Sequence, residues 1–174
     1  MGLFDRLMGR ELPERRDARK IYLRLMEQAR NPDFFGAGRV ADDFDGRIDM
    51  IALHLTLMME RLRSEGEDGK LLNQALFDEM KDDFEVALRE EGISDTGVKR
   101  RIKPMIGHFY DRLKTYTDAL KTDDAQTKLA ESFVIGDSTD TVSPFAEKLS
   151  VYSLTWLKNL RGVSLKQITS TRFY

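Results

Sequence analysis

Residues 46–63 read GRIDMIALHLTLMMERLR, and this stretch decides the fold. Apolar residues recur in it at intervals of three and four, which is the spacing of one face of an α-helix. The seam consists of Ile48, Ile51, Leu55, Met58 and Leu62, and Met50, Leu53, Leu57 and Met59 widen it until only Asp49, Thr56, Glu60 and Arg63 form a polar stripe. A helix this apolar is expected at the centre of a bundle, with other helices packed around it.

The same spacing predicts helices on both sides of this central one. The first covers residues 14–31 and is ended by Pro32, and the next covers 72–88 and is closed by Gly92 in a left-handed conformation. A further helix is capped by Asp95 and is apolar from Val98 to Tyr116. A short helix is expected within 123–132, and a long one from Ser143 to Gly162. Asp45 is expected to cap the central helix, and Pro104 to kink or restart its own helix on the solvent side. No segment alternates like a β-strand. The prediction is an all-α, irregular bundle of about six helices.

The chain has no internal repeat or composition break, which predicts one domain. The helical domain is expected to span residues 14–163, between an amino-terminal segment, 1–13, and a tail, 164–174. In the first segment Leu3, Phe4, Leu7 and Met8 share one side of a short helix, a pattern typical of a weak interfacial anchor. The polar run GDSTDT at 136–141 is expected to be a loop.

The composition excludes several classes of function. None of the 174 residues is a cysteine, and the two histidines stand in no metal-binding or nucleotide-binding motif, so no metal, cofactor or small-molecule substrate is expected. A net charge of −2 gives no overall field for DNA. No window approaches the roughly 20 apolar residues of a membrane span. We therefore expect a non-enzymatic, cytoplasmic protein that binds another protein and reaches the inner membrane only peripherally, from its cytosolic face.

Charged residues on apolar helix faces are the first candidates for partner contacts. Two rows stand out, a basic row of Arg47, His54 and Arg61 that is expected on the buried side of the central helix, and an acidic row of Glu79, Asp83 and Glu90 in the next helix. Residues seven apart lie on nearly the same line of a helix, and an unpaired carboxylate is costly to bury. Two interpretations remain open. Either the two rows neutralise each other inside the bundle, or one of them meets a polar feature of a partner.

Two other charged groups are also considered. Lys99, Arg100, Arg101 and Lys103 lie in the first turns of a helix, where cations oppose the helix dipole. This position indicates contact with an acidic partner, a phosphate or lipid headgroups, and the alternative is a solvated face. The neighbours Asp82 and Asp83 point about 100° apart on a helix, so they are not expected to act as a general acid and base.

Two long stretches carry a resemblance to a known family. The first is ARNPDFF at 29–35 followed by VADDFDGRIDMIALHL at 40–55, and the second is the run from Gln74 to Leu120, which includes LREEG at 88–92. Both resemble the ubiquinol–cytochrome c chaperone family, bacterial relatives of the mitochondrial factor that assembles the cytochrome bc1 complex. Together they cover roughly half of the chain.

The resemblance implies an all-helical domain, without catalytic residues, that binds newly made cytochrome b while the respiratory bc1 complex is assembled. The residues that match the family pattern are Asp45, Gly46, Arg47, Asp49 and His54, and then Asp82, Asp83, Leu88, Arg89, Glu90 and Gly92. The chain departs from the pattern after Lys128, where ESFVIG replaces a run of the type R-N-x-[YF]-G, and Pro104 interrupts a helix that the family leaves uninterrupted.

The candidate partner-binding residues are therefore Arg47, His54, Arg61, Asp82, Asp83, Lys99, Arg100 and Lys103, and the expected partner is cytochrome b or another bc1 component. One rival is an adaptor that binds the ribosome or the inner-membrane surface through the basic 99–103 cluster. The other rival is an enzyme with a site made of His54, Arg47 and the carboxylates of the 72–88 helix, although no motif defines a reaction class for it.

Overall fold

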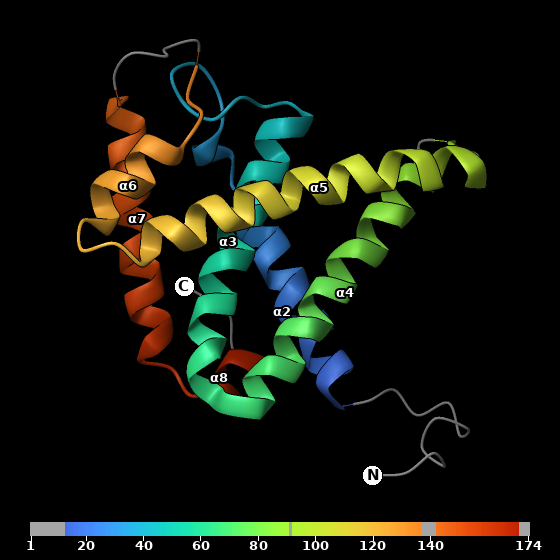
Figure 1. Ribbon diagram of the computed structural model, residues 1–174, viewed down its shortest axis with the longest axis horizontal. Coiled ribbons are helices and arrows are strands. Elements are labelled where there is room, and N and C mark those ends of the chain that lie inside the picture. The colour runs from blue at the N-terminus through green and yellow to red at the C-terminus, as the bar shows by residue number, and fades with distance from the viewer. Residues whose placement is uncertain (1–12, 91, 137–141, 171–174) are drawn as a thin grey trace.

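The computed structural model describes residues 13–90, 92–136 and 142–170. Its elements are α2 (Pro13–Ala29), η1 (Pro32–Phe34), α3 (Phe44–Leu62), η2 (Arg63–Glu65), α4 (Gly66–Glu90), α5 (Asp95–Leu120), α6 (Ala125–Ser132), α7 (Pro144–Arg161) and α8 (Leu165–Ser170). In this part of the chain the helices are joined by short connections, and the prediction of an all-α irregular bundle is confirmed (Figure 1).

Helix α3 lies at the centre of the bundle, as its sequence predicts. It contacts α2, α4, α5 and α7, and its apolar seam is buried from Ile48 to Leu62. One residue of the expected polar stripe, Thr56, is also buried, because its hydroxyl donates to the carbonyl of Ala52 within the helix and needs no water. The exposed side of α3 is therefore narrower than the predicted polar stripe of four residues.

The ends of the helices differ from the predicted caps at two places. Asp43 caps α3 by accepting a 2.8 Å hydrogen bond from the backbone N–H of Gly46, and Ser94 caps α5 in the same way through Gly97. The predicted caps, Asp45 and Asp95, lie inside the first turn, so both predictions are wrong by one or two residues. A capping side chain must stand before the first helical residue and reach the N–H three positions on, which depends on how the chain enters the helix.

Helix α5 runs for 26 residues through Pro104 without restarting, which corrects one part of the prediction. Pro104 is exposed, as expected, and a proline on the solvent side leaves a carbonyl that water can satisfy. Figure 1 shows α5 crossing α3.

The predicted start of α7 is confirmed, with Ser143 as the capping residue and Pro144 as the first helical residue.

The junctions between helices depend on glycine at two positions. Gly66 has a φ of +62° between η2 and α4, and Gly92 has a φ of +79° after α4, so the left-handed end predicted for this helix is confirmed. After Gly162 the chain forms α8, whose Ile168 is buried and accepts a hydrogen bond from Arg24 of α2. The predicted segment 1–13 and loop 136–141 lie outside the described residues, apart from Pro13 and Gly136.

No helix among the described residues combines the length and the apolar character needed to cross a membrane.

Candidate functional site

An open groove of about 670 Å³ lies between the end of α2 with η1, the start of α3, the second half of α4 and the middle of α5. We call it the α2–α5 groove. Its lining is mostly apolar and includes Phe35, Phe44, Ile51, Phe84 and Met105. Phe44, the first residue of α3, is 53% exposed at this groove, although a phenylalanine is usually buried. The groove therefore offers apolar surface that residues 13–90, 92–136 and 142–170 leave uncovered.

Three of the charged groups at the groove have partners within the chain. Arg47 and Asp42 form an ion pair with Nη2 and Oδ1 2.9 Å apart, and Asp83 accepts a 2.8 Å hydrogen bond from the hydroxyl of Tyr22. Burial and the adjacent Asp83 carboxylate raise the pKa of Tyr22, which keeps its hydroxyl protonated as the donor. Two of the predicted partner-binding residues, Arg47 and Asp83, thus lie at the same groove, on α3 and α4.

The predicted basic row is only partly buried. His54 and Arg61 are enclosed in the core, whereas the side chain of Arg47 is 63% exposed, so the prediction of three buried basic groups in line is wrong at Arg47. The first turn of α3, which carries Arg47, borders the open groove. Arg47 does lie in line with His54 and Arg61 on the helix, but its burial also depends on how far the neighbouring helices extend.

His54 belongs to a chain of hydrogen bonds in the core. Burial lowers the pKa of His54 to about 4, so the ring is neutral, and its Nδ1 donates to the carbonyl of Met50 at 2.8 Å. Nε2 is then the acceptor for the hydroxyl of Tyr152, at 2.8 Å, and that hydroxyl accepts in turn from the side-chain amide of Gln28. The ring of Trp156 packs edge-on against the imidazole. This network joins α2, α3 and α7.

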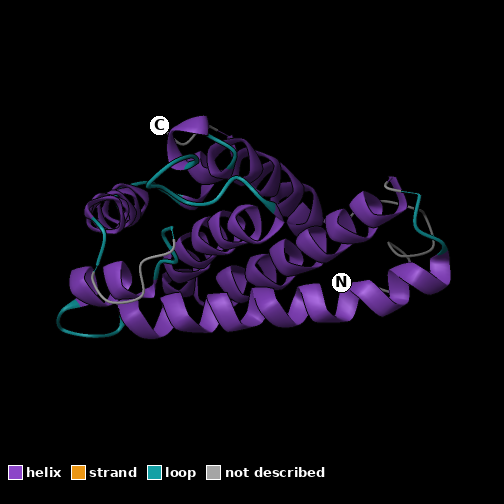
Figure 2. Ribbon diagram, turned by 90° about the horizontal axis from the view of Figure 1, so that it is seen from above, coloured by secondary structure: helices purple, strands orange, loops and turns teal. Residues whose placement is uncertain are grey.

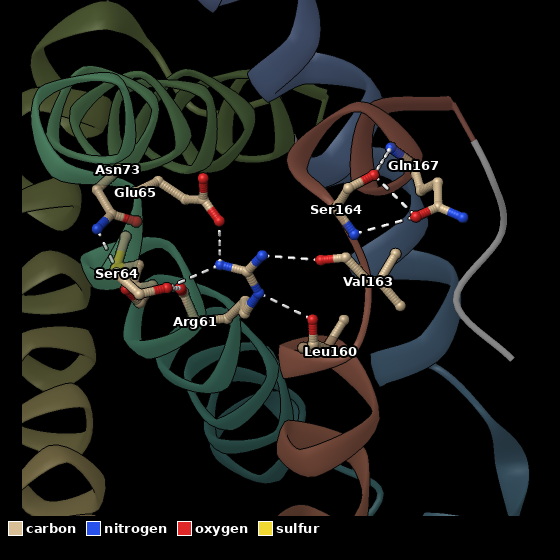
Figure 3. Close-up of polar contacts among 9 residues, drawn as sticks. Arg61, Ser64, Glu65, Asn73, Leu160, Val163, Ser164 and Gln167 are labelled. Atoms are coloured by element: carbon tan, nitrogen blue, oxygen red, sulfur yellow. Dashed lines mark hydrogen bonds and ion pairs between the residues drawn. The ribbon is translucent and has the colours of Figure 1, made fainter.

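Arg61 ties the end of α3 to the end of α7 (Figure 3). Its Nε donates to the carbonyl of Leu160 at 2.8 Å and its Nη2 to that of Val163 at 2.7 Å, while Nη1 bonds Ser64 and pairs with Glu65. The carbonyl of Leu160 also accepts a 3.1 Å hydrogen bond from the backbone N–H of Val163, so the guanidinium adds a second donor there and joins the end of α7 and the residue Val163 to α3.

The acidic residues of α4 pair with side chains of α2 and do not pair with the basic row of α3. Glu79, nearly buried, lies 3.4 Å from Nε of Arg15 and 3.6 Å from Nη1 of Arg19. Asp82 pairs with Arg15 at 2.7 Å, and Glu90 is exposed. The interpretation that the two rows neutralise each other is therefore wrong. The sequence held a signal for this pairing, because Arg15, Arg19 and Tyr22 are spaced four and three residues apart on one helix face.

The remaining candidates lie apart from the groove. Lys99, Arg100 and Lys103 are exposed near the start of α5. The residues of the hypothetical enzyme site do not come together, since His54 is enclosed in the core, Arg47 is at the groove and Glu79 pairs with α2. Over the described ranges no three His, Cys, Asp or Glu side chains are grouped so that they could hold a metal ion.

These observations define an all-α domain with an open, mostly apolar groove at which Arg47, Asp42 and Asp83 have partners within the chain. The chain belongs to the ubiquinol-cytochrome C chaperone family, whose model matches residues 37–174. It is 24% identical over 107 residues to the human and the mouse ubiquinol-cytochrome c reductase complex assembly factor 1. Each match covers 62% of this chain and 36% of the relative, so the chain spans about a third of the length of these relatives.

A solved structure is also similar. The crystal structure of the Cbp3 homologue from Brucella abortus matches with a TM-score of 0.74 and 29% identity, over 91% of this chain and 88% of that one. The resemblance seen in the sequence is thus confirmed at the level of the family. All residues that line the α2–α5 groove, except Gly36, fall in the stretches 29–35, 40–55 and 74–120 that carry the resemblance.

Proposed function

We propose that the chain is a non-enzymatic assembly chaperone of the cytochrome bc1 complex and that it holds newly made cytochrome b in the α2–α5 groove. Membership of the ubiquinol-cytochrome C chaperone family supports a role in assembly of the bc1 complex. The observation that carries the proposed site is the groove itself, which is apolar, open and lined by the stretches that resemble the family.

The chemistry of the groove suits a segment of a membrane protein. Cytochrome b exposes apolar helices until it is inserted and assembled, and an amphipathic or apolar helix can lay a few side chains into a hydrophobic groove. Phe44 at the start of α3 and Phe35 beside η1 offer aromatic surface, and burying such rings is worth roughly 2 kcal/mol each. The Arg47–Asp42 pair and Asp83 are polar groups, each with a partner within the chain, that can fix the orientation of a client in the groove.

The candidate residues divide into two roles in this proposal. Arg47 and Asp83 contact the client, because they lie at the groove and remain partly accessible. His54, Arg61 and Asp82 act through the fold, since their polar atoms bond Tyr152, the carbonyls of α7 and Arg15. Replacing His54 or Arg61 is expected to lower stability before it changes recognition, whereas the exposed Asp82–Arg15 pair should contribute little to stability.

The test replaces one exposed apolar residue at the groove and a matched one elsewhere. In a strain that lacks the gene, Phe44→Glu is compared with Val151→Glu, because Phe44 is 53% and Val151 48% exposed, and Val151 lies on α7 away from the groove. The unmodified chain and Val151→Glu should restore assembled bc1 complex, measured by haem b difference spectra, and Phe44→Glu should restore little of it. Circular dichroism of both purified variants checks that they remain folded.

Two results would overturn the proposal. If the strain without the gene has its full content of haem b in bc1, the chain has no role in assembly. If folded Phe44→Glu restores the complex as well as Val151→Glu does, the client is not held at the groove.

A further inference from the structure

We propose that the exposed face of α5 that carries Lys99, Arg100, Lys103 and Tyr110 is a docking surface for an anionic lipid bilayer. This inference is independent of the client and concerns where the chain works. Figure 2 shows α5, the long helix that crosses in front of α3 in Figure 1, as the outer layer along one side of the molecule. Its outer face is therefore free to meet an extended surface.

The cations on this face are not used inside the chain. Lys99, Arg100, Arg101 and Lys103 are all exposed, and none of the ion pairs formed by residues 13–90, 92–136 and 142–170 includes them. They are the fifth to ninth residues of α5, just beyond the first turn, in which the helix dipole acts. Their charge is therefore available to a partner outside the described part of the chain.

The nearest carboxylates are engaged by a different cation. Lys99 shares a small depression with Glu85, Arg89 and Asp95. Arg89 pairs with Glu85 at 3.3 Å and with Asp95 at 3.5 Å, so each of these carboxylates has an ion-pair partner other than Lys99. The positive charge of the 99–103 cluster is thus directed to solvent.

An aromatic side chain continues the same line. Tyr110 is seven residues after Lys103, nearly the same angular position on a helix, and it is 49% exposed. Its ring packs against Phe77 of α4 with centroids 5.1 Å apart, which holds it at the surface. Tyrosine is favoured at the level of lipid headgroups, because its ring is apolar and its hydroxyl is polar. Lys99, Lys103 and Tyr110 together form a basic and aromatic edge along α5.

A lipid surface fits this edge better than RNA does. The whole chain has a net charge of −2, whereas nucleic-acid binders usually carry a basic surplus. Peripheral binding to an anionic membrane needs only a local cluster of cations, and each cation contributes by its own attraction to the surface. Placed on a bilayer in this way, α5 would lie between the membrane and α3, with Met105 of the groove on the same helix.

The test uses the full chain and two triple variants with equal changes of charge. Lys99→Gln/Arg100→Gln/Lys103→Gln removes the cluster, and Lys148→Gln/Lys158→Gln/Arg161→Gln removes three exposed cations of α7. Both retain residues 1–12 unchanged, so any membrane affinity of that segment is common to them. Binding is measured by co-sedimentation with vesicles of phosphatidylcholine alone or mixed with phosphatidylglycerol, at low and high salt, and with ribosomal RNA.

The unmodified chain and the α7 variant should bind the mixed vesicles, more weakly as salt rises and much more weakly to neutral vesicles. The α5 variant should bind the mixed vesicles roughly 100-fold more weakly, about fivefold for each cation removed. Equal binding of the two folded variants to mixed vesicles would overturn the proposal. So would binding of ribosomal RNA that depends on the α5 cations while vesicle binding does not.

Discussion

The hydroxyl of Tyr152 donates a 2.8 Å hydrogen bond to Nε2 of His54 and so joins α7 to the centre of α3. Because Nδ1 of His54 donates to the carbonyl of Met50, the tautomer of the imidazole is fixed by the backbone of its own helix. Gln28 of α2 donates to the same hydroxyl. Three helices therefore meet at one polar chain, and each of its members is satisfied by the next.

Replacing Tyr152 by phenylalanine should destabilise the fold. Tyr152→Phe keeps the ring but leaves Nε2 of His54 without its donor, which should cost about 1–3 kcal/mol in the free energy of unfolding. Urea denaturation followed by circular dichroism measures the change. Tyr110→Phe is the matched control, because that hydroxyl belongs to a half-exposed residue and its loss should change stability by less than about 0.5 kcal/mol. Equal losses in the two variants would argue against the network.

The neutral His54 predicts a specific dependence of stability on pH. The unfolded chain takes up a proton on this residue near pH 6.5, and the folded chain only near pH 4, because burial lowers the pKa of His54 to about 4. Between these values the unfolded state binds more protons, so the stability falls as pH is lowered through this window, by up to about 3 kcal/mol, and is insensitive to His54 above it.

His54→Leu should lack this part of the pH dependence, measured as the difference in unfolding free energy between about pH 7 and pH 5. NMR of the unmodified chain supplies a second measurement if the variant folds poorly. The ring signals of His54 should not titrate between those two pH values. A midpoint near the ordinary value of histidine would show that the ring is not held neutral.

Arg61 and Arg47 lie on the same line of α3 and should respond differently to the same change. Arg61→Met removes a donor from the carbonyls of Leu160 and Val163 and leaves the carboxylate of Glu65 without its ion pair, which should cost about 3–5 kcal/mol. Arg47→Met removes a solvent-exposed pair with Asp42 and should cost less than about 1 kcal/mol. Chemical denaturation of both variants compares them. Similar stability would contradict the different roles given to the two arginines.

Replacing two helical glycines by alanine should change the stability of the fold in opposite directions. A Cβ atom on Gly69 would lie 1.9 Å from the carbonyl oxygen of Leu62, so Gly69→Ala forces α4 away from α3 and should cost about 1–3 kcal/mol. A Cβ atom on Gly107 would meet nothing within 4 Å, so Gly107→Ala should stabilise α5 by about 0.5–1 kcal/mol. Thermal unfolding of the two variants tests the pair, and a stabilised Gly69→Ala would contradict the close approach.

The sequence predicts most where the information is local. The seam of α3 shows its period within 18 residues, so its helix and its central position follow from the pattern, and Gly92 marks the end of α4 because few other residues adopt its φ. The caps were misplaced because Asp43 and Asp45 are equally suitable residues, and only the path of the chain before α3 selects between them.

The sequence predicts less where contacts join distant helices. Glu79 lies 64 residues after Arg15, and its pairing depends on α2 packing along α4, which no local pattern specifies. The α2–α5 groove is a space left by four elements, so its residues could be listed as family-like segments but not recognised as one site. Arg47 was expected to be buried for the same reason, since its wheel position says nothing about where neighbouring helices end.

The most direct test of the central claim is site-specific photo-cross-linking from the groove during synthesis of cytochrome b. A photoreactive residue replaces Ala87, an exposed residue of α4 that lines the groove, or Val151 on α7 as the matched position. We predict an adduct with newly made cytochrome b from position 87 and none from position 151. An adduct from position 151 with none from position 87 would contradict the assignment of the groove as the client site.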